Sequence, residues 1–322
     1  MPVSHKNELY GVTACAVHKT DNVTEYSVAC DTPNGKMKVF HLFPGIDYAE
    51  TSFRAASCNY RRQTAADVIE IAYCKAGRFE CEYRSGYFTY VGEGDCAVGI
   101  LEAQTENPYF PLEYYTGCAV IIDLKKTGTF FRTAVEDVSI NLSALLQKFC
   151  PHSRCAVFKT PDVLRPIFED LYAISLRSDY DSPRTLGYLR LKVLELLFLL
   201  LEYQRDEPPC SSGCFSGTYI KKIKAIKTDI TENLYKKIRL KELSQKYNIG
   251  VTMLKDCFKA VYGKPVFVYR KEYKMQKAAQ LLKTTDKSIT EIAALVGYEN
   301  PNKFSSAFKE IFSRSPREYR KE

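Results

Sequence analysis

Two stretches of the chain repeat one pattern, LKELSQKYNIGVTMLKDCFKAVY at residues 240–262 and ITEIAALVGYENPNKFSSAFKEIF at residues 289–312. Phe258 and the lysine after it recur as Phe308 and its lysine, 50 residues later. The leading parts of the two stretches are offset by 49 residues. The difference of one residue falls between paired helices, where insertions are tolerated best. The repeat therefore indicates one supersecondary unit that occurs twice.

Each copy has the signals of two helices joined by a tight turn. In the first copy we expect a leading helix over residues 241–247 and a trailing helix over residues 252–261. Asn248 lies between them and tolerates a left-handed backbone. In the second copy Gly297 supplies that turn, and Asn300 is a good cap for a helix that begins with proline. Both copies thus predict a helix-turn-helix.

The trailing helices have an apolar side and a polar, partly basic side. A helix-turn-helix places such a polar face in the major groove of DNA, where lysine donates to guanine and asparagine pairs with adenine. A polar face can also be merely solvated, but two copies in a basic region favour recognition. The predicted DNA-binding residues are Thr252, Lys255, Asp256, Lys259, Asn302, Lys303, Ser306 and Lys309.

The charge of the chain is unevenly distributed. The chain has 322 residues and a net charge of +8, and its length suggests two domains. Residues 219–322 hold 24 Lys and Arg against 11 Asp and Glu, whereas residues 1–218 hold 22 against 27. A basic third attached to an acidic body predicts a polyanion partner, with nucleic acid first. The sequence contains neither a secretory signal nor a membrane span, so we expect a cytoplasmic protein without a membrane partner.

The first half of the chain alternates apolar and polar residues over short runs. Runs such as 68–73, 79–83, 87–91, 96–100 and 120–124 predict strands, with Ala76-Gly77 and other glycine-containing pairs as turns. Short strands at this spacing predict an antiparallel barrel or sandwich over residues 1–160. The fold class is therefore α+β, a β domain followed by helices.

Helical periodicity begins near residue 162 and resumes at residue 183. The two helices predict an antiparallel hairpin over residues 161–204, followed by a proline- and serine-rich linker at 205–218. Both helices can cover the barrel. Apolar side chains on the other side of the second helix favour a second subunit as well, so we expect a homodimer. The predicted dimerisation residues are Leu191, Leu194 and Phe198.

Residues 219–322 resemble the DNA-binding domain of the AraC/XylS family of transcription regulators. The resemblance implies seven helices with two helix-turn-helix motifs joined by a long helix, promoter DNA as ligand, and activation through contact with RNA polymerase. Gly250, Ser313 and Lys274 depart from the family pattern, and Asp256 would repel phosphate. The matching residues are Leu240, Leu243, Leu254, Phe258, Lys259, Gly263, Tyr269, Lys274, Met275, Ala279, Leu282, Ile289, Ile292, Ala293, Gly297, Tyr298, Phe304, Phe308, Lys309, Ser315, Pro316, Tyr319 and Arg320.

The N-terminal part is similar to the cupin-like sensor domain of clostridial-type members. This resemblance rests on residues 69–74, 77–78, 94–95 and 110–117, and it implies a barrel that binds an unidentified small-molecule effector. Aromatic side chains could line the pocket, although ordinary core packing explains them too. The candidate effector-binding residues are Tyr73, Phe79, Tyr83 and Tyr87.

Two alternatives to a ligand-responsive regulator concern catalysis and redox chemistry. A cupin metalloenzyme needs two histidines and a carboxylate, but the four histidines form no such set, so we expect no enzyme, metal or cofactor. The twelve cysteines are expected to be mostly buried thiols. A thiol-based redox regulator is the alternative, with Cys210 and Cys214 or Cys150 and Cys155 as its pairs.

Overall fold

The computed structural model divides into two compact units, Met1–Cys214 and Phe215–Glu322. None of the helices described is long and apolar enough to cross a membrane. The structure describes residues 14–30, 35–58, 67–82, 86–100, 108–128, 140–150, 156–204 and 215–321.

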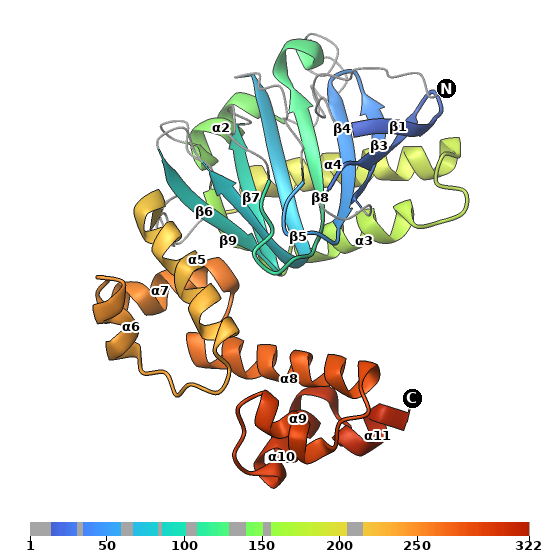
Figure 1. Ribbon diagram of the computed structural model, residues 1–322. Coiled ribbons are helices and arrows are strands. Elements are labelled where there is room, and N and C mark those ends of the chain that lie inside the picture. Colours follow the sequence, from blue (N-terminus) through green and yellow to red (C-terminus); the bar gives the residue numbers. More distant parts are fainter. Residues whose placement is uncertain are drawn as a thin grey trace. The chain divides into compact units, whose positions relative to one another are not determined.

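An antiparallel sheet forms the body of the first unit (Figure 1). Its strands are β1 (Ala14–Lys19), β2 (Val23–Val28), β3 (Gly35–Phe43), β4 (Ile46–Phe53), β5 (Val68–Glu82), β6 (Tyr87–Gly92), β7 (Asp95–Ile100), β8 (Tyr115–Asp123) and β9 (Ala156–Lys159). The strand order is β1-β2-β3-β4-β8-β5-β6, and β7 pairs with β5 and β9. The predicted α+β class with an N-terminal antiparallel sheet is confirmed. Closure of the sheet into a cupin-like barrel stays a prediction.

The longest strand corrects one expectation. The sequence suggested two strands separated by a turn at Ala76-Gly77, but β5 runs through both residues. The pairing of β5 with β8 shifts register between Cys74 and Ala76, and Gly77 has φ of 85°. A Cβ at Gly77 would lie 2.2 Å from the Tyr114 carbonyl oxygen. The glycine therefore accommodates a bulge inside a continuous strand.

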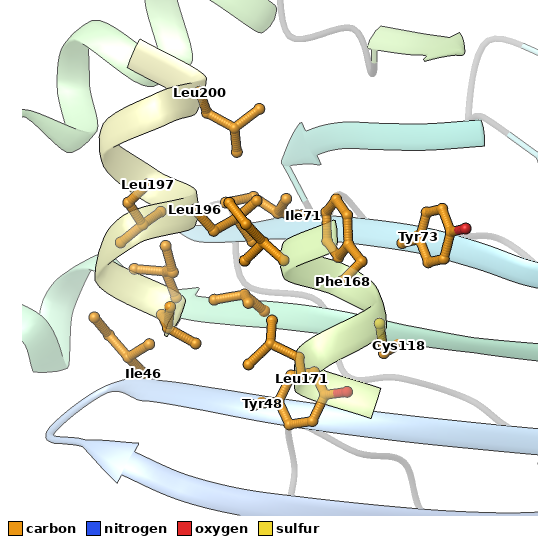
Figure 2. Close-up of a cluster of buried hydrophobic side chains, with 14 of the residues drawn as sticks. Ile46, Tyr48, Ile71, Tyr73, Cys118, Phe168, Leu171, Leu196, Leu197 and Leu200 are labelled. Atoms are coloured by element: carbon orange, nitrogen blue, oxygen red, sulfur yellow. The ribbon is translucent and has the colours of Figure 1, made fainter. Parts of the chain in front are cut away.

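Helices cover one face of this sheet (Figure 1). They are α2 (Leu142–Phe149), α3 (Arg165–Ser175) and α4 (Pro183–Glu202). Helical periodicity in the sequence predicted α3 and α4, whereas α2 and β9 were not expected. Ser182 caps α4 by accepting from the Thr185 amide, and Pro183 occupies its first turn. The apolar faces of α3 and α4 meet side chains from the strands; Figure 2 labels Ile46, Tyr48, Ile71, Tyr73, Cys118, Phe168, Leu171, Leu196, Leu197 and Leu200.

The other face of the sheet carries a separate apolar cluster. Phe110 stacks between Phe53 and Tyr115, with ring centroids 4.9 Å and 5.6 Å apart. Cys58 is buried in this cluster, and Cys30 packs against it. Each face of the sheet therefore has its own core, as expected when strand residues alternate between two buried faces.

The second unit is helical over residues 217–321. Its helices are α5 (Gly217–Glu232), α6 (Leu240–Lys246), α7 (Val251–Tyr262), α8 (Val266–Thr284), α9 (Ile289–Leu295), α10 (Pro301–Phe312) and α11 (Pro316–Lys321). They match the seven helices that the resemblance implied. The linker predicted at 205–218 is too long at its end, because residues 215–216 form the short strand β10 and α5 begins at Gly217. Residues 205–214 lie outside the described part of the chain.

Candidate DNA-binding site

The first helix-turn-helix consists of α6 and α7. Asn248 has φ of 46°, the left-handed conformation expected for the turn. The Ile249 amide donates to the Ser244 carbonyl at 3.0 Å, and the Ser244 hydroxyl donates to the Ile249 carbonyl at 2.7 Å. Gly250 precedes α7 and contributes no side-chain cap. Polar groups at the end of α6 thus close the turn, while α7 begins without a side-chain acceptor for its first amides.

The second helix-turn-helix consists of α9 and α10 and has stronger end signals. Ser288 and Glu291 form a capping box at the start of α9. Gly297 has φ of 77°. Asn300 accepts from the amides of Asn302 and Lys303 at 2.8 Å and 3.3 Å. The turn and helix start predicted from these residues are therefore present.

Both trailing helices bury the face predicted from their apolar spacing. Leu254, Phe258 and Val261 of α7 have no exposed surface, and neither have Phe304 and Phe308 of α10. Each trailing helix is therefore held against its own unit by the apolar face, which leaves the opposite face for a ligand.

The opposite faces are exposed, as a DNA-reading surface requires. All eight predicted side chains are solvent exposed: Thr252, Lys255, Asp256 and Lys259 on α7, and Asn302, Lys303, Ser306 and Lys309 on α10. No ion pair in the described part of the chain involves the four lysines among them. Their charges are therefore available to phosphate or to the acceptors on guanine.

A buried arginine on α8 holds the segment between α5 and α6. Arg270 is 8% exposed, and its guanidinium donates to four carbonyl oxygens. The acceptors belong to Ile230 at 3.1 Å, Asn233 at 2.8 Å, Leu234 at 3.1 Å and Lys236 at 2.6 Å. Carbonyls at a helix end lack partners within the helix, so Arg270 satisfies one carbonyl in the last turn of α5 and three in the segment that follows it.

The same segment touches the turn of the second helix-turn-helix. A Cβ at Gly297 would lie 2.2 Å from the Leu234 carbonyl oxygen, so the two backbones are in close contact. Lys274, one turn after Arg270 on α8, donates to the Gly297 carbonyl at 3.2 Å. Burial lowers the Lys274 pKa to about 8, with a further contribution from Arg270. We call Arg270, Lys274, Leu234 and Gly297 the α8 clamp, because they join the two halves of the unit.

Residues 243–322 match a family model described as a helix-turn-helix domain. The chain is 27% identical over 127 residues to the transcriptional activator RhaR of Mannheimia succiniciproducens, covering 39% of this chain and 44% of RhaR. It is 24% identical over 193 residues to the virulence regulon transcriptional activator VirF of Yersinia enterocolitica, covering 60% of this chain and 69% of VirF. The match thus spans less than half the length of RhaR.

A solved structure is similar to about a third of this chain. The C-terminal domain of the response regulator YesN from Fusobacterium nucleatum is 34% identical, covering 30% of this chain and 95% of that chain, with a TM-score of 0.29. The second unit is a helix-turn-helix domain of the AraC/XylS family. In this AraC/XylS domain, α7 and α10 are the trailing helices of the two motifs and α8 is the helix between the motifs.

Arg270 of the AraC/XylS domain was not predicted from the sequence, and Lys274 was considered only in the comparison with the family pattern. Basic residues are frequent throughout α8, and periodicity alone does not separate a buried arginine from its exposed neighbours. The groups that fix the position of Arg270 are carbonyls at and just after the end of α5, which lie 34 to 40 residues earlier in the chain.

In the first unit, the structure places two of the candidate effector residues on opposite faces of the sheet. Tyr73 is buried on the helix-covered face and stacks on Phe168 at 4.9 Å, whereas Phe79 packs with the cluster on the opposite face. Tyr87 is 48% exposed, and Tyr83 lies outside the described residues. Tyr73 and Phe79 therefore do not share one pocket, and an effector-binding role for each of the four residues stays a prediction.

A buried carboxylate links β4 to the end of α3. Glu50 accepts from the Tyr48 hydroxyl at 2.9 Å and from the Ser175 hydroxyl. Burial raises the Glu50 pKa, and the hydrogen bonds from Ser175 and Tyr48 together with the charges of Lys38 and Lys75 oppose that rise. This carboxyl group is therefore sensitive to the packing of α3 on the sheet.

The predicted dimerisation residues differ in exposure. Leu191 and Phe198 of α4 are 64% and 42% exposed, whereas Leu194 is partly buried against the core. Leu191 and Phe198 thus present apolar area to solvent, and Leu194 contributes mainly to the fold. The dimer itself stays a prediction.

The cysteine pairs named from sequence lie mostly outside the described residues. The structure does not describe Cys155, Cys210 or Cys214. Cys150 is buried, with its thiol directed to the Val98 carbonyl at 3.5 Å. Within the described ranges, no group of three or more histidine, cysteine or acidic side chains is placed to hold a metal ion.

Proposed function

We propose that the chain is a sequence-specific DNA-binding transcription regulator that acts as an activator. The observation that carries this proposal is the pair of exposed basic faces on α7 and α10, each backed by a buried apolar face. The names of RhaR and VirF, both transcriptional activators, support the direction of regulation. Promoter DNA is then the ligand, and RNA polymerase is the partner that activation requires.

The length of α8 supports binding of both recognition helices to one side of the duplex. Its 19 residues span about 28 Å at 1.5 Å per residue. One turn of DNA measures about 34 Å, so two major grooves on one side are about that far apart. The α8 clamp would limit changes in the spacing of α7 and α10.

Binding to DNA selected from a random duplex pool by the purified full chain tests this proposal. We expect Lys255→Ala and Lys303→Ala to weaken binding by about 1 to 3 kcal/mol, or roughly 5- to 150-fold in Kd, if they contact bases. If a lysine contacts phosphate instead, its replacement by alanine should weaken binding to all DNA sequences alike. It should also lower the slope of log Kd against log salt concentration by about 1. Lys36→Ala removes one exposed charge from the first unit and serves as the matched control.

The assay has a clear negative outcome. If neither lysine variant differs from the Lys36→Ala control at fixed salt, α7 and α10 do not read DNA through these faces. Circular dichroism of each variant excludes unfolding as the cause of any loss, because all three residues are exposed.

We infer a homodimer from the apolar side of α4. Leu191 and Phe198 lie seven residues apart on the same helical face and are both well exposed. Introducing lysine at both positions should convert the dimer to a monomer in sedimentation velocity. Leu176→Lys, at another exposed leucine, is the control; a dimer that survives the double variant contradicts this interface.

The first unit is proposed to control DNA binding in the cytoplasm in response to a small-molecule effector. Its two apolar cores and the buried Glu50 between β4 and α3 support a sensor in which helix packing responds to the state of the sheet. We propose a regulatory role without catalysis. Isothermal titration of the full chain with pooled metabolites, followed by DNA binding in their presence, tests effector control.

A further inference from the structure

Two cysteines of the first unit face each other across adjacent chain segments. Cys30 follows β2, Cys58 follows β4, and the two form an antiparallel bridge pair. Residues directly opposite each other in such a pair have side chains on the same side of the sheet. Both cysteines indeed belong to the same apolar cluster, with Cys58 buried in it and Cys30 packed against it.

The spacing of an antiparallel pair suits a disulfide. Opposite residues have Cα atoms about 4.5 or 5.5 Å apart, and both values fall within the roughly 4.4 to 6.8 Å range of disulfides. Opposite Cβ atoms are about 4.5 to 5.5 Å apart, slightly more than the roughly 3.5 to 4.5 Å that a disulfide prefers. Bond formation therefore needs a small approach of the two segments, and a bond formed under such strain is easily reduced.

Local packing leaves room for the sulfur of Cys30. A Cβ at Gly35 would lie 2.7 Å from the Cys30 Sγ, so the absence of a side chain there accommodates the thiol. The thiol is directed to the Val28 carbonyl at 3.5 Å. Cys30 is partly exposed, whereas Cys58 is 1% exposed, so a small oxidant in solution reaches Cys30 first.

The other described cysteines lack this arrangement. Cys15 lies opposite Ser27, and Cys74 lies opposite Gly117. Burial raises the pKa of Cys74 and of Cys118 to about 12, which keeps both protonated and unreactive. Among strand partners in the described ranges, cysteine faces cysteine only at 30 and 58.

We propose that Cys30 and Cys58 are a thiol modification site that forms a reversible disulfide with a peroxide as oxidant. The Cys30 thiolate attacks one oxygen of hydrogen peroxide, the O–O bond breaks, and water leaves after protonation to give a sulfenic acid. The Cys58 thiol then attacks that sulfur, the S–O bond breaks, and a second water leaves. Two electrons pass from the two thiols to the peroxide, and a dithiol reductant reverses the reaction by exchange. This proposal does not depend on DNA binding.

Peptide mapping of the full chain tests the site. The reduced protein is treated with hydrogen peroxide, remaining thiols are alkylated, and the protein is digested without reduction. We expect a peptide pair linked through Cys30 and Cys58, lighter than the two thiol peptides by two hydrogen atoms, that dithiothreitol separates. Cys30→Ser should abolish this product, and Cys15→Ser should leave it unchanged.

Two results would overturn the proposal. One is a folded, peroxide-treated protein in which Cys30 and Cys58 stay as thiols or become higher sulfur acids without a link. The other is a linked product that forms equally fast in protein unfolded in urea, because the bridge pairing would then have no part in it. The wild-type measurement decides both, so the test stands even if Cys30→Ser fails to fold.

Discussion

Replacing Arg270 by alanine should destabilise the AraC/XylS domain by about 3 kcal/mol. The change removes four hydrogen bonds to carbonyl oxygens. Two of these carbonyls belong to the buried residues Ile230 and Leu234, and leaving a buried acceptor without a partner costs about 1 to 3 kcal/mol. Two such groups give roughly 2 to 6 kcal/mol. We expect a value in the lower part of this range, since replacement by alanine also removes the cost of burying a guanidinium.

A lysine at the same position should recover part of the loss. Its ammonium group has three donors at one point, whereas the guanidinium spreads five donors over a planar fork. One ammonium cannot reach carbonyls of residues from Ile230 to Lys236 together. We therefore expect Arg270→Lys to cost about half as much as Arg270→Ala. Lys277→Ala, at an exposed position of α8, is the control and should change stability by less than about 0.5 kcal/mol.

Hydrogen exchange on the full chain, read by mass spectrometry, measures this effect separately from the first unit. A loss of 3 kcal/mol makes exchange in the most protected peptides of α5 and α8 faster by on the order of 100-fold. The domain should still be folded, because domains of this size have about 5 to 15 kcal/mol of stability. If Arg270→Ala speeds exchange less than fivefold, or if lysine matches arginine, the reasoning about the clamp is wrong.

Four further substitutions test backbone conformation and buried charge. Gly297→Ala should lower stability by about 2 kcal/mol or more, since its Cβ would meet the Leu234 carbonyl and residue 297 has a left-handed backbone. Gly250→Ser should raise stability by a few tenths of a kcal/mol through a new helix cap. The midpoints of thermal denaturation rank the two variants. Ser313→Gly should stabilise by about 1 kcal/mol because Ser313 has φ of 56°, and an unchanged midpoint would count against strain there. The pKa of Glu50 in the folded chain lies above its ordinary value of 4.5. Between pH 4.5 and the folded pKa, folding is coupled to proton uptake, so stability falls as pH rises through that range. Glu50→Gln should therefore unfold at higher urea than wild type at pH 8, with the difference lost below pH 4.5; a constant difference would refute the titration of Glu50.

The helix-turn-helix motifs could be predicted because their signals are local. Asn248 and Gly297 mark left-handed turns, and Asn300 with the proline after it marks a helix start. Each signal acts on the backbone within a few residues of itself, so it works before any distant part of the chain is in place. The exposed faces of α7 and α10 followed from the apolar spacing of the same helices.

The first unit was less predictable because its strands depend on distant neighbours. The bulge near Gly77 keeps β5 continuous and changes which side chains share a face, so Tyr73 and Phe79 lie on opposite sides of the sheet. A register change of one residue moves every later side chain to the other face, and alternation in the sequence does not reveal it. The shared aromatic pocket could therefore not be judged from spacing alone.

By itself, the sequence determined that an antiparallel β domain is followed along the chain by a basic domain with a duplicated helix-turn-helix. Only the tertiary structure decided that Arg270 is buried against the end of α5 and that Cys30 faces Cys58. Turns and helix ends depend on the conformational preferences of neighbouring residues. The arginine and the cysteine pair depend on contacts between residues about 28 to 40 positions apart, which exist only once the chain has folded.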